Sequence, residues 1–349
     1  MKETKITRPP LASLACVVET CDLYGQVGQN NLTIRKVYGK DQIRYLRCRA
    51  CGQEFSERKN TALWNSKIDE ARAVSIAAHL SEGCSFKSTA RLVKADVSTI
   101  KRLNRRLGEH GQTFHDQQVS DVQVKALQAD ERHGFAVSKQ QPQWEAEVMD
   151  PESKFVLAHV QGRRNETLIR SLLTDAHQRL AAASVQDFVL FTDGEPNYAS
   201  LFPELFGTPY RPARQGSQGR LPKVRYRIPR RLAHVQVIKH RTGGKLQSVE
   251  IRHRHGSVKR VNEAVAALGH NVPNTAIIER RNGTARLMNI TQVRKTLAFS
   301  RNPAAKEALG WWTLTVYNWC REHRMLRQEL EQPVGKKSMN SGRQQWRLV

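Results

Sequence analysis

Three acidic residues stand where carboxylates could bind divalent cations. Asp130 lies at or near the end of an apolar segment, Asp193 directly follows the segment QDFVLFT, and Glu279 lies in NTAIIERRNG. Two divalent ions about 4 Å apart can activate a water or a 3′-hydroxyl and stabilise the leaving oxygen of a phosphodiester. Because these ions prefer hard oxygen ligands, the acids indicate a phosphodiester-cleaving site that uses Mg2+, with Mn2+ able to substitute.

The third acid has competitors elsewhere in the chain: Glu195, Glu250 and Glu263. We favour Glu279 because Asn282 and Arg286 follow it at helical spacing and therefore share its face. Thr275 is the expected N-cap of this helix. An amide and a guanidinium beside a carboxylate suit a surface that binds DNA phosphates. Each acid taken alone also fits an ordinary solvated group, since most Asp and Glu are exposed.

Four cysteines near the N-terminus have the spacing of a zinc site. They form a C-x4-C pair and a C-x2-C pair: Cys16, Cys21, Cys48 and Cys51. Four thiolates suit tetrahedral Zn2+, and Gly52 after the second pair allows a tight turn around the ion. NLTIRKVYG and DQIRYLRC between the pairs read as two short strands, so we expect a zinc ribbon; four unrelated thiols are the alternative. Cys84 and Cys320 are isolated and are expected to be buried.

The elements around Asp130 and Asp193 follow the order strand, hairpin, helix, strand. After the first strand, WEAEVMD and FVLAHVQG flank the turn residues PESK and form the hairpin. Asn165 can cap the helix ETLIRSLLTDAHQRLA, and QDFVLFT is the next strand. This order is typical of a ribonuclease-H-like α/β fold, a mixed sheet flanked by helices, in which the first strand and the strand after the helix are parallel neighbours. Asp130 and Asp193 would then meet at one edge of the sheet.

Three helical patterns lie between the cysteines and the acids. They are DEARAVSIAAHLSEG, FKSTARLVK and VSTIKRLNRRLGEHG, with Gly108 and Gly111 near the end of the third. The first would bury small apolar side chains: Ala71, Val74, Ala77 and Ala78. A tight turn before a basic third helix is typical of a helix-turn-helix; a plain helical bundle is the alternative. The third helix would present these residues to DNA: Ser98, Thr99, Lys101, Arg102 and Arg105.

A strongly basic region lies between the second and third acids. Residues 208–260 hold fifteen Lys and Arg and a single acid. Apolar and polar residues alternate on both sides of Gly243 and Gly244, which predicts a hairpin; a solvated basic loop is the alternative. We expect a β-rich insert at about 208–272 whose arginines bind the DNA backbone: Arg225, Arg227, Arg230 and Arg231.

The charge of the whole chain is that of a nucleic-acid-binding protein. Its 349 residues include 57 Lys and Arg against 32 Asp and Glu, a net charge of +25 that attracts polyanions. A ribosomal or merely soluble basic protein would share this charge. No segment approaches the roughly 18 apolar residues that cross a bilayer, and no signal-peptide pattern is present. We therefore expect a non-secreted, cytoplasmic protein without membrane association, whose reducing surroundings favour metal-bound cysteines.

These patterns divide the chain into four parts. We expect a zinc ribbon over 1–57, a helix-turn-helix domain over 58–115, a ribonuclease-H-like catalytic domain with its basic insert over 120–335, and a flexible tail over 336–349. Near the end of the third part, KEALGWWTLTVYNWCREHR reads as an aromatic helix that packs in the core.

Several motifs together resemble transposases of the insertion-sequence-one family, within the wider Asp-Asp-Glu group. The matching pieces span most of the chain: RYLRCRACG, STARLVKADVSTIKRL, ADERHGF, TDGEPNY, IERRNGTARL and KTLAFSRNPAAKEALGWW. The resemblance implies a zinc ribbon, a helix-turn-helix that reads inverted terminal repeats, and a magnesium-dependent core with Asp130, Asp193 and Glu279 as its catalytic triad. The chain departs from the compact family pattern in its wider first cysteine pair and in the longer segment before Glu279.

The expected function is that of a DNA transposase, which cleaves the ends of an insertion sequence and joins them to target DNA. Because both ends must be handled together, we expect a homodimer or a higher homo-oligomer. The alternatives are a non-catalytic DNA-binding regulator with the same N-terminal domains, a metal-dependent nuclease or resolvase without strand transfer, and an inactive relic.

Overall fold

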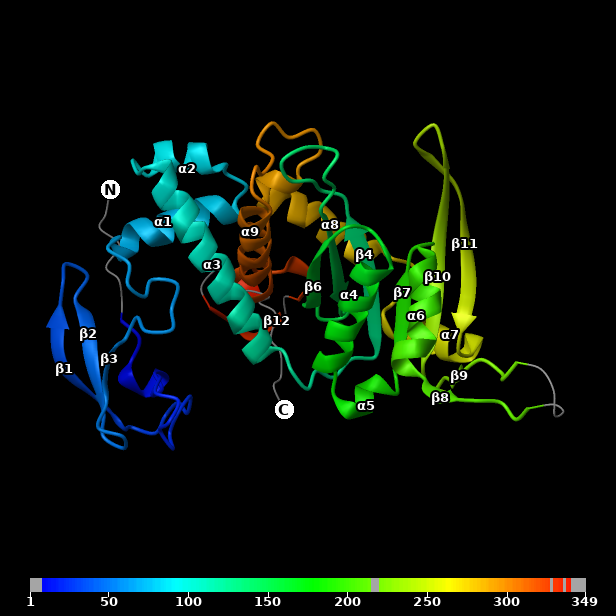
Figure 1. The fold of residues 1–349 in the computed structure, drawn as a ribbon, viewed down its shortest axis with the longest axis horizontal. Coiled ribbons are helices and arrows are strands. Elements are labelled where there is room, and N and C mark those ends of the chain that lie inside the picture. Colours follow the sequence, from blue (N-terminus) through cyan, green and yellow to red (C-terminus); the bar gives the residue numbers. More distant parts are fainter. Residues whose placement is uncertain (1–7, 215–219, 327–328, 335–336, 340–349) are drawn as a thin grey trace.

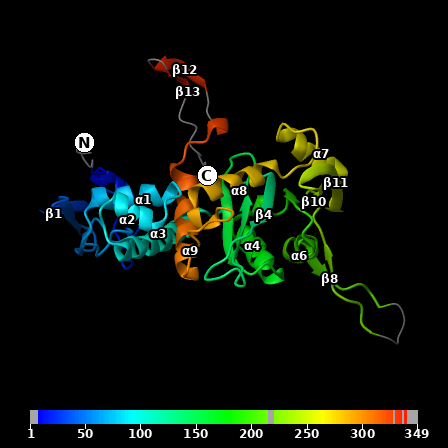
Figure 2. The same cartoon turned by 90° about the horizontal axis from the view of Figure 1, so that it is seen from above.

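The computed structural model describes residues 8–214, 220–326, 329–334 and 337–339 (Figure 1). The expected tail at 336–349 therefore lies outside the described residues, apart from β13 (Lys337–Met339), which pairs with β12 (Glu329–Val334). Figure 2 shows this strand pair extending away from the remaining elements. Within the described ranges, no helix has the length and apolar character needed to cross a membrane.

The N-terminal part is a small antiparallel sheet with three of the four cysteines on its loops and Cys48 at the end of a strand. It consists of a 3-10 turn and three strands: η1 (Leu11–Ser13), β1 (Leu32–Tyr38), β2 (Ile43–Cys48) and β3 (Glu54–Ser56). The two strands expected between the cysteine pairs are confirmed, and β3 adds a third that the sequence pattern did not indicate. The only apolar residue of β3, Phe55, packs beside the cysteines. A strand of three residues with one apolar side chain is too short to give a recognisable pattern.

Three helices follow: α1 (Glu70–Ser81), α2 (Phe86–Leu92) and α3 (Val97–Gln118). Each begins at a side chain that accepts a backbone N–H, as short polar residues do at helix N-termini: Asp69, Ser85 and Asp96. The expected buried face of α1 is wrong, because the helix buries Ala73, Ile76 and Leu80 while Val74 is exposed. The larger side chains, Ile76 and Leu80, occupy the core that α1 forms with α2 and α3.

The expected end of α3 near Gly108 and Gly111 is also wrong, since the helix continues to Gln118. Both glycines face α9 (Pro303–Thr315). A Cβ atom on Gly108 would lie 2.3 Å from Ala308 Cα, and one on Gly111 would lie 2.5 Å from a side-chain oxygen of Thr315. The glycines therefore let two helices approach closely, and the intrinsic helix penalty of glycine is outweighed by this packing.

The largest sheet among the described residues has six strands in the order β11-β10-β7-β4-β5-β6. Their bounds are β4 (Ala126–Arg132), β5 (Trp144–Met149), β6 (Val156–Gly162), β7 (Val189–Thr192), β10 (Ala233–Thr242) and β11 (Lys245–His255). β4, β7 and β10 are mutually parallel neighbours, whereas β5, β6 and β11 pair antiparallel. The hairpin of β5 and β6 and the parallel pairing of β4 with β7 are confirmed.

Helices cover both faces of this sheet (Figure 1). One face packs against α4 (Glu166–Arg179) and α6 (Pro196–Phe206), with the short α5 (Ala182–Val185) between them. Asn165 caps α4 by accepting the N–H of Leu168, as expected. The other face packs against α7 (Val258–Ala267) near β10, and against α8 (Ala276–Met288) and α9 near β5 and β6.

The segment expected as a separate basic insert is divided between the central sheet and its periphery. The first half of β10 is a buried sheet strand, with Val235 and Val237 in the core, whereas the second half and β11 are mostly exposed. The hairpin about Gly243 and Gly244 is confirmed, and both glycines have positive φ. The remainder of the segment forms the strand pair β8 (Thr208–Tyr210) and β9 (Arg225–Arg227), and the helix α7.

The C-terminal segments complete the core. After α8 come η2 (Ile290–Gln292), α9, the π-helix η3 (Val316–Cys320) and η4 (Arg324–Leu326). Trp311 and Tyr317 are buried, as expected for the aromatic helix. The expectation for the isolated cysteines is wrong, because Cys84 is half-buried and Cys320 is exposed.

The contact between α3 and α9 leads to a stability prediction. Gly108→Val should destabilise the protein by about 3 kcal/mol, because the added side chain collides with the backbone of Ala308. Gly283→Ala, also inside a helix but with open space around it, is the matched control and should stabilise by up to about 1 kcal/mol. Urea denaturation measures both; equal effects of the two variants would contradict the proposed packing.

The buried His115 leads to a prediction about the pH dependence of stability. His115 Nε2 donates a 2.8 Å hydrogen bond to the carbonyl oxygen of Leu157, and burial lowers the pKa of His115 to about 4. The unfolded chain takes up a proton near pH 6.5, so this contribution to stability is complete above that pH and is lost as the pH falls toward 4. Between pH 6.5 and 4, the wild type should lose about 1.4 kcal/mol more per pH unit than His115→Gln. Parallel slopes of unfolding free energy against pH would refute this.

Candidate metal and nucleic-acid sites

An acidic cluster forms where β4 and β7 end side by side. Asp130, Glu131 and Asp193 each offer a carboxylate oxygen, and these atoms lie within 4.8 Å of one another. Asp130 and Glu131 belong to β4, and Asp193 follows the last residue of β7. The predicted meeting of Asp130 and Asp193 is therefore confirmed, and it results from the parallel pairing of their two strands.

Asp130 is half-buried and faces α8. Asn282 Nδ2 donates to Asp130 Oδ2 over 2.7 Å, and the N–H of Glu131 donates to Asp130 Oδ1 over 2.8 Å. Burial raises the pKa of Asp130 to about 6, and the neighbouring charge of Asp193 contributes to the rise. A carboxylate with a raised pKa gains free energy from a nearby cation, so this position suits a metal ion.

Glu131 points to the opposite face of the sheet, because successive residues of a strand alternate. Tyr198 OH donates to its Oε1, and Arg164 donates to its Oε2 over 3.2 Å. Burial raises the pKa of Glu131 to about 7. The sequence-based prediction missed this acid, since ADERHGF gives no signal that separates it from Asp130. Its oxygens accept from a phenol and a guanidinium, whereas those of Asp130 accept from an amide and a backbone N–H, so Glu131 already has a cationic partner and Asp130 has none at hydrogen-bond distance among the described residues.

Glu279 lies outside the acidic cluster. Its carboxylate binds Lys239 and accepts a 2.7 Å hydrogen bond from Thr275 Oγ1, and its side chain is 42% exposed. It is close enough that its charge raises the pKa of Asp130. Thr275 occupies the N-cap position, but the expectation that it caps α8 is wrong, because its hydroxyl donates to Glu279; Asn274 accepts the N–H of Ala276 instead.

Asn282 is a structural residue rather than an exposed DNA contact, so that part of the prediction is wrong. Its side chain is buried, with Nδ2 directed to Asp130 and Oδ1 accepting from Arg132 Nη1 over 2.8 Å. Because a guanidinium can only donate, this contact fixes the orientation of the amide. Arg286, on the same helix, remains half-exposed and can still reach a phosphate.

A network of buried charges lies beneath Asn282 and holds it beside Asp130. Arg132 donates to Glu147 through two nitrogens, over 2.7 and 2.6 Å, and to Glu145 over 3.3 Å. Glu147 also accepts from Arg281 of α8, and Glu145 accepts from Lys306 of α9. All five side chains are buried, so each charge requires a partner. The network therefore ties β4 and β5 to α8 and α9, and sets the position of Asn282 beside Asp130.

The ligand chemistry of the cluster fits a hard divalent cation. Asp130, Glu131 and Asp193 offer only oxygen atoms, the ligands that Mg2+ and Mn2+ prefer. Arg164 lies among these acids, 3.2 Å from Glu195 and 3.9 Å from Asp193, and its guanidinium stacks on Trp144. A metal ion at the cluster would either share the carboxylates with this guanidinium or displace it.

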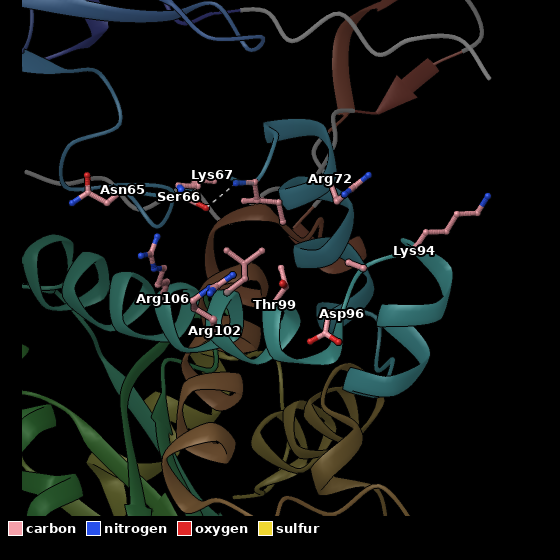
Figure 3. Close-up of a pocket in the computed structure, with 12 residues that line it drawn as sticks. Asn65, Ser66, Lys67, Arg72, Lys94, Asp96, Thr99, Arg102 and Arg106 are labelled. Atoms are coloured by element: carbon pink, nitrogen blue, oxygen red, sulfur yellow. Dashed lines mark hydrogen bonds between the residues drawn. The ribbon is translucent and has the colours of Figure 1, made fainter.

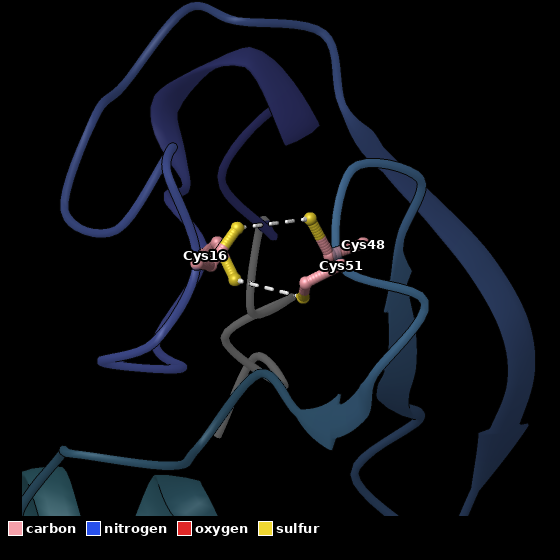
Figure 4. Close-up of side chains that lie close together, drawn as sticks. Cys16, Cys48 and Cys51 are labelled. Atoms are coloured by element: carbon pink, nitrogen blue, oxygen red, sulfur yellow. Dashed lines mark hydrogen bonds between the residues drawn. The ribbon is translucent and has the colours of Figure 1, made fainter.

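The four N-terminal cysteines converge as predicted (Figure 4). The Sγ atoms of Cys16 and Cys51 lie 3.9 Å apart, as do those of Cys21 and Cys48. Tetrahedral zinc with Zn–S bonds of about 2.3 Å requires sulfurs about 3.8 Å apart. The cluster therefore could hold a metal such as zinc without rearrangement, and Gly52, with φ of +73°, makes the tight turn expected after the second pair.

The residues of α3 that were predicted to bind DNA are mostly exposed. Ser98, Lys101, Arg102 and Arg105 are exposed, and Thr99 is half-buried. Thr99 and Arg102 line a hollow of about 640 Å3 toward α1, together with further cations (Figure 3): Lys67, Arg72, Lys94 and Arg106. Such a concentration of positive charge suits phosphate groups.

The predicted DNA-binding arginines of the basic segment are all exposed: Arg225, Arg227, Arg230 and Arg231. Arg231 pairs with Asp187 over 2.9 Å, and Arg227 stacks on the ring of Tyr210. Arg231 is thus partly neutralised, whereas the other three present their charges to solvent near β9.

Comparisons with known proteins add no family assignment. A scan against protein-family models found no match, and a search of curated proteins found none either. The resemblance carried by the sequence motifs therefore stays a prediction, and the geometry of the site is the basis for assigning a function.

Zinc content provides a test of the cysteine cluster. Cys48→Ser in the full chain should reduce bound zinc from about one ion per chain to none and expose the N-terminal sheet to protease, because small zinc domains fold only with their metal. Cys84→Ser, a thiol outside the cluster, is the control and should retain the ion. Metal analysis after gel filtration decides this, and full zinc content in Cys48→Ser would exclude a four-cysteine site.

Proposed function

We propose that this chain is a DNA transposase of the Asp-Asp-Glu type, with a ribonuclease-H-like catalytic domain. The observation that carries the proposal is the meeting of Asp130 and Asp193 at the ends of two parallel strands. The strand order β6-β5-β4-β7-β10, with only β5 antiparallel to both neighbours, supports this fold. The net charge of +25 supports a polyanionic substrate.

In this proposal Asp130 and Asp193 hold the divalent cations, and Glu279 is the third acid. Magnesium, when bound, supplies Lewis acidity toward the scissile phosphate and lowers the pKa of the attacking water or hydroxyl. Asn282 keeps Asp130 in place through its amide. Glu279 lies on the Asp130 side of the sheet and exchanges Lys239 for the cation, whereas Glu131 is held by Tyr198 and Arg164 on the other side.

The N-terminal elements supply DNA binding in the same proposal. The four-cysteine cluster is a zinc ribbon, and α1, α2 and α3 are a helix-turn-helix that recognises the terminal inverted repeats. The exposed arginines near β9 and the β10–β11 hairpin bind the DNA backbone. Cleavage frees a 3′-hydroxyl that attacks target DNA, and two copies of the chain hold the two element ends. The working compartment is the prokaryotic cytoplasm, at the nucleoid.

A non-catalytic DNA-binding regulator is the second candidate. The observation that favours it is the pairing of the acids with cations of the protein itself, Arg164 with Asp193 and Lys239 with Glu279. Such pairs stabilise the acids without any metal.

Substitution of the acids separates the two candidates. Asp130→Asn and Asp193→Asn should each reduce cleavage and strand transfer at least about a thousandfold, because loss of metal-held charge costs about 4 kcal/mol of transition-state stabilisation. Glu279→Gln should behave alike, whereas Glu131→Gln should retain more activity and Glu204→Gln, on the exposed surface of α6, should retain all of it. The assay uses labelled terminal DNA, Mg2+ or Mn2+ and a plasmid target.

Each outcome of this assay assigns a role. Cleavage without joining identifies a nuclease, and full activity in all three acid variants, or no activity of the wild type with either metal, excludes the proposed chemistry. Loss with Glu131→Gln but not with Glu279→Gln would move the third position to Glu131.

A further inference from the structure

A second hollow next to α3 differs in character from the cationic one. It has a volume of about 760 Å3 and lies between α2, α3 and the segment that leads into α9. Its wall is mostly apolar: Phe86, Val97, Ile290, Phe299 and Leu309. Its rim carries four exposed cations: Lys87, Lys101, Arg105 and Arg301. None of the residues that line it is acidic.

The occupant must match both of these features. The rim calls for negative charge, whereas the wall calls for a flat apolar surface, and duplex DNA presents only the first because its bases are stacked inside. An unpaired nucleotide presents both, since its base stacks on aromatic side chains while the phosphates on either side bind Lys and Arg. We propose that this hollow binds an unpaired base of single-stranded DNA, an inference that rests on the proposed function.

An exposed leucine at the hollow supports this occupant. Leu297 lines the cavity and is 98% exposed, so its whole side chain stands in water. Covering such a side chain with a base removes apolar surface from water and is favourable. Phe299, two residues on, is half-buried and already packs at 5.3 Å against Phe135, which leaves part of its ring toward the hollow.

The wall of the hollow is joined to the strand that carries Asp130. Ser300 forms a bridge with Ala136, and its carbonyl accepts the N–H of Val137 over 2.8 Å. Ala136 and Val137 belong to the segment that directly follows β4. Figure 1 shows the loop after β4 and the loop before α9 side by side above the sheet. A DNA strand held in the hollow is therefore linked, through this bridge, to the segment that continues the strand of Asp130.

The test measures binding of fluorescein-labelled single-stranded DNA of mixed sequence, with no added divalent cation, by fluorescence anisotropy. Leu297→Ser and Phe299→Ser should each weaken this binding about tenfold and leave duplex binding unchanged, because the base covers the apolar surface of Leu297 and stacks on the ring of Phe299, where stacking contributes about 1–3 kcal/mol per base. Leu287→Ser, an exposed leucine on α8 outside the hollow, is the control and should bind like the wild type. Since Leu297 has almost no contacts to lose, its variant keeps the test valid even if Phe299→Ser folds poorly.

The same oligonucleotide with an abasic site at its centre completes the test. Weaker binding of the abasic strand by the wild type, and no such difference in Leu297→Ser, supports a base in the hollow. Equal binding of intact and abasic strands, or equal losses for single strand and duplex, overturns the inference. Displacement of the strand by an acidic amphipathic peptide more readily than by unlabelled DNA would identify a protein partner instead and would also overturn it.

The outcome is independent of the cleavage assay. If the wild type binds intact and abasic strands equally but still performs strand transfer, only the present inference is excluded. Intact base discrimination without any cleavage removes the proposed enzyme and leaves a single-strand binding site.

Discussion

The chain of hydrogen bonds from Glu147 through Arg132 and Asn282 to Asp130 is the constraint on which the candidate site depends. Glu147 and Arg132 are buried between the sheet and α8, where an unpaired charge costs several kcal/mol. α8 can therefore dock in only one register, the one that completes these bonds. That register also sets the approach of Glu279 to Asp130, so the geometry of the acids is fixed by groups that never contact solvent.

The same network extends the constraint to the N-terminal helices. Lys306 of α9 is fully buried against Glu145, and α9 in turn packs along α3 through Gly108 and Gly111. The position of α3 relative to the acidic cluster is thus transmitted through one helix. In the proposed transposase, this packing would keep α3 and the acidic cluster at a constant spacing, which a flexible linker between them would not provide.

Much of the site could be predicted from local patterns. Apolar segments and the order of the elements predicted the strands that bring Asp130 and Asp193 together, and cysteine spacing predicted the four-cysteine cluster. The buried polar face could not be predicted, because charged residues at alternate strand positions, such as Glu145 and Glu147, look like a solvated face. Their burial depends on Arg281 and Lys306, which lie more than a hundred residues away in sequence and leave no local signal.

In the proposed transposase, the electrostatics of the acidic cluster favour the binding of cations. DNA and the carboxylates repel one another, and the protein already sets Arg164 and Lys239 against these acids. Burial raises the pKa of Asp130 to about 6, so the ionised form of this carboxyl is only slightly favoured near neutral pH. Divalent ions at the cluster would offset both the burial and the repulsion, and would release Arg164 and Lys239 to bind the phosphates that arrive with the DNA.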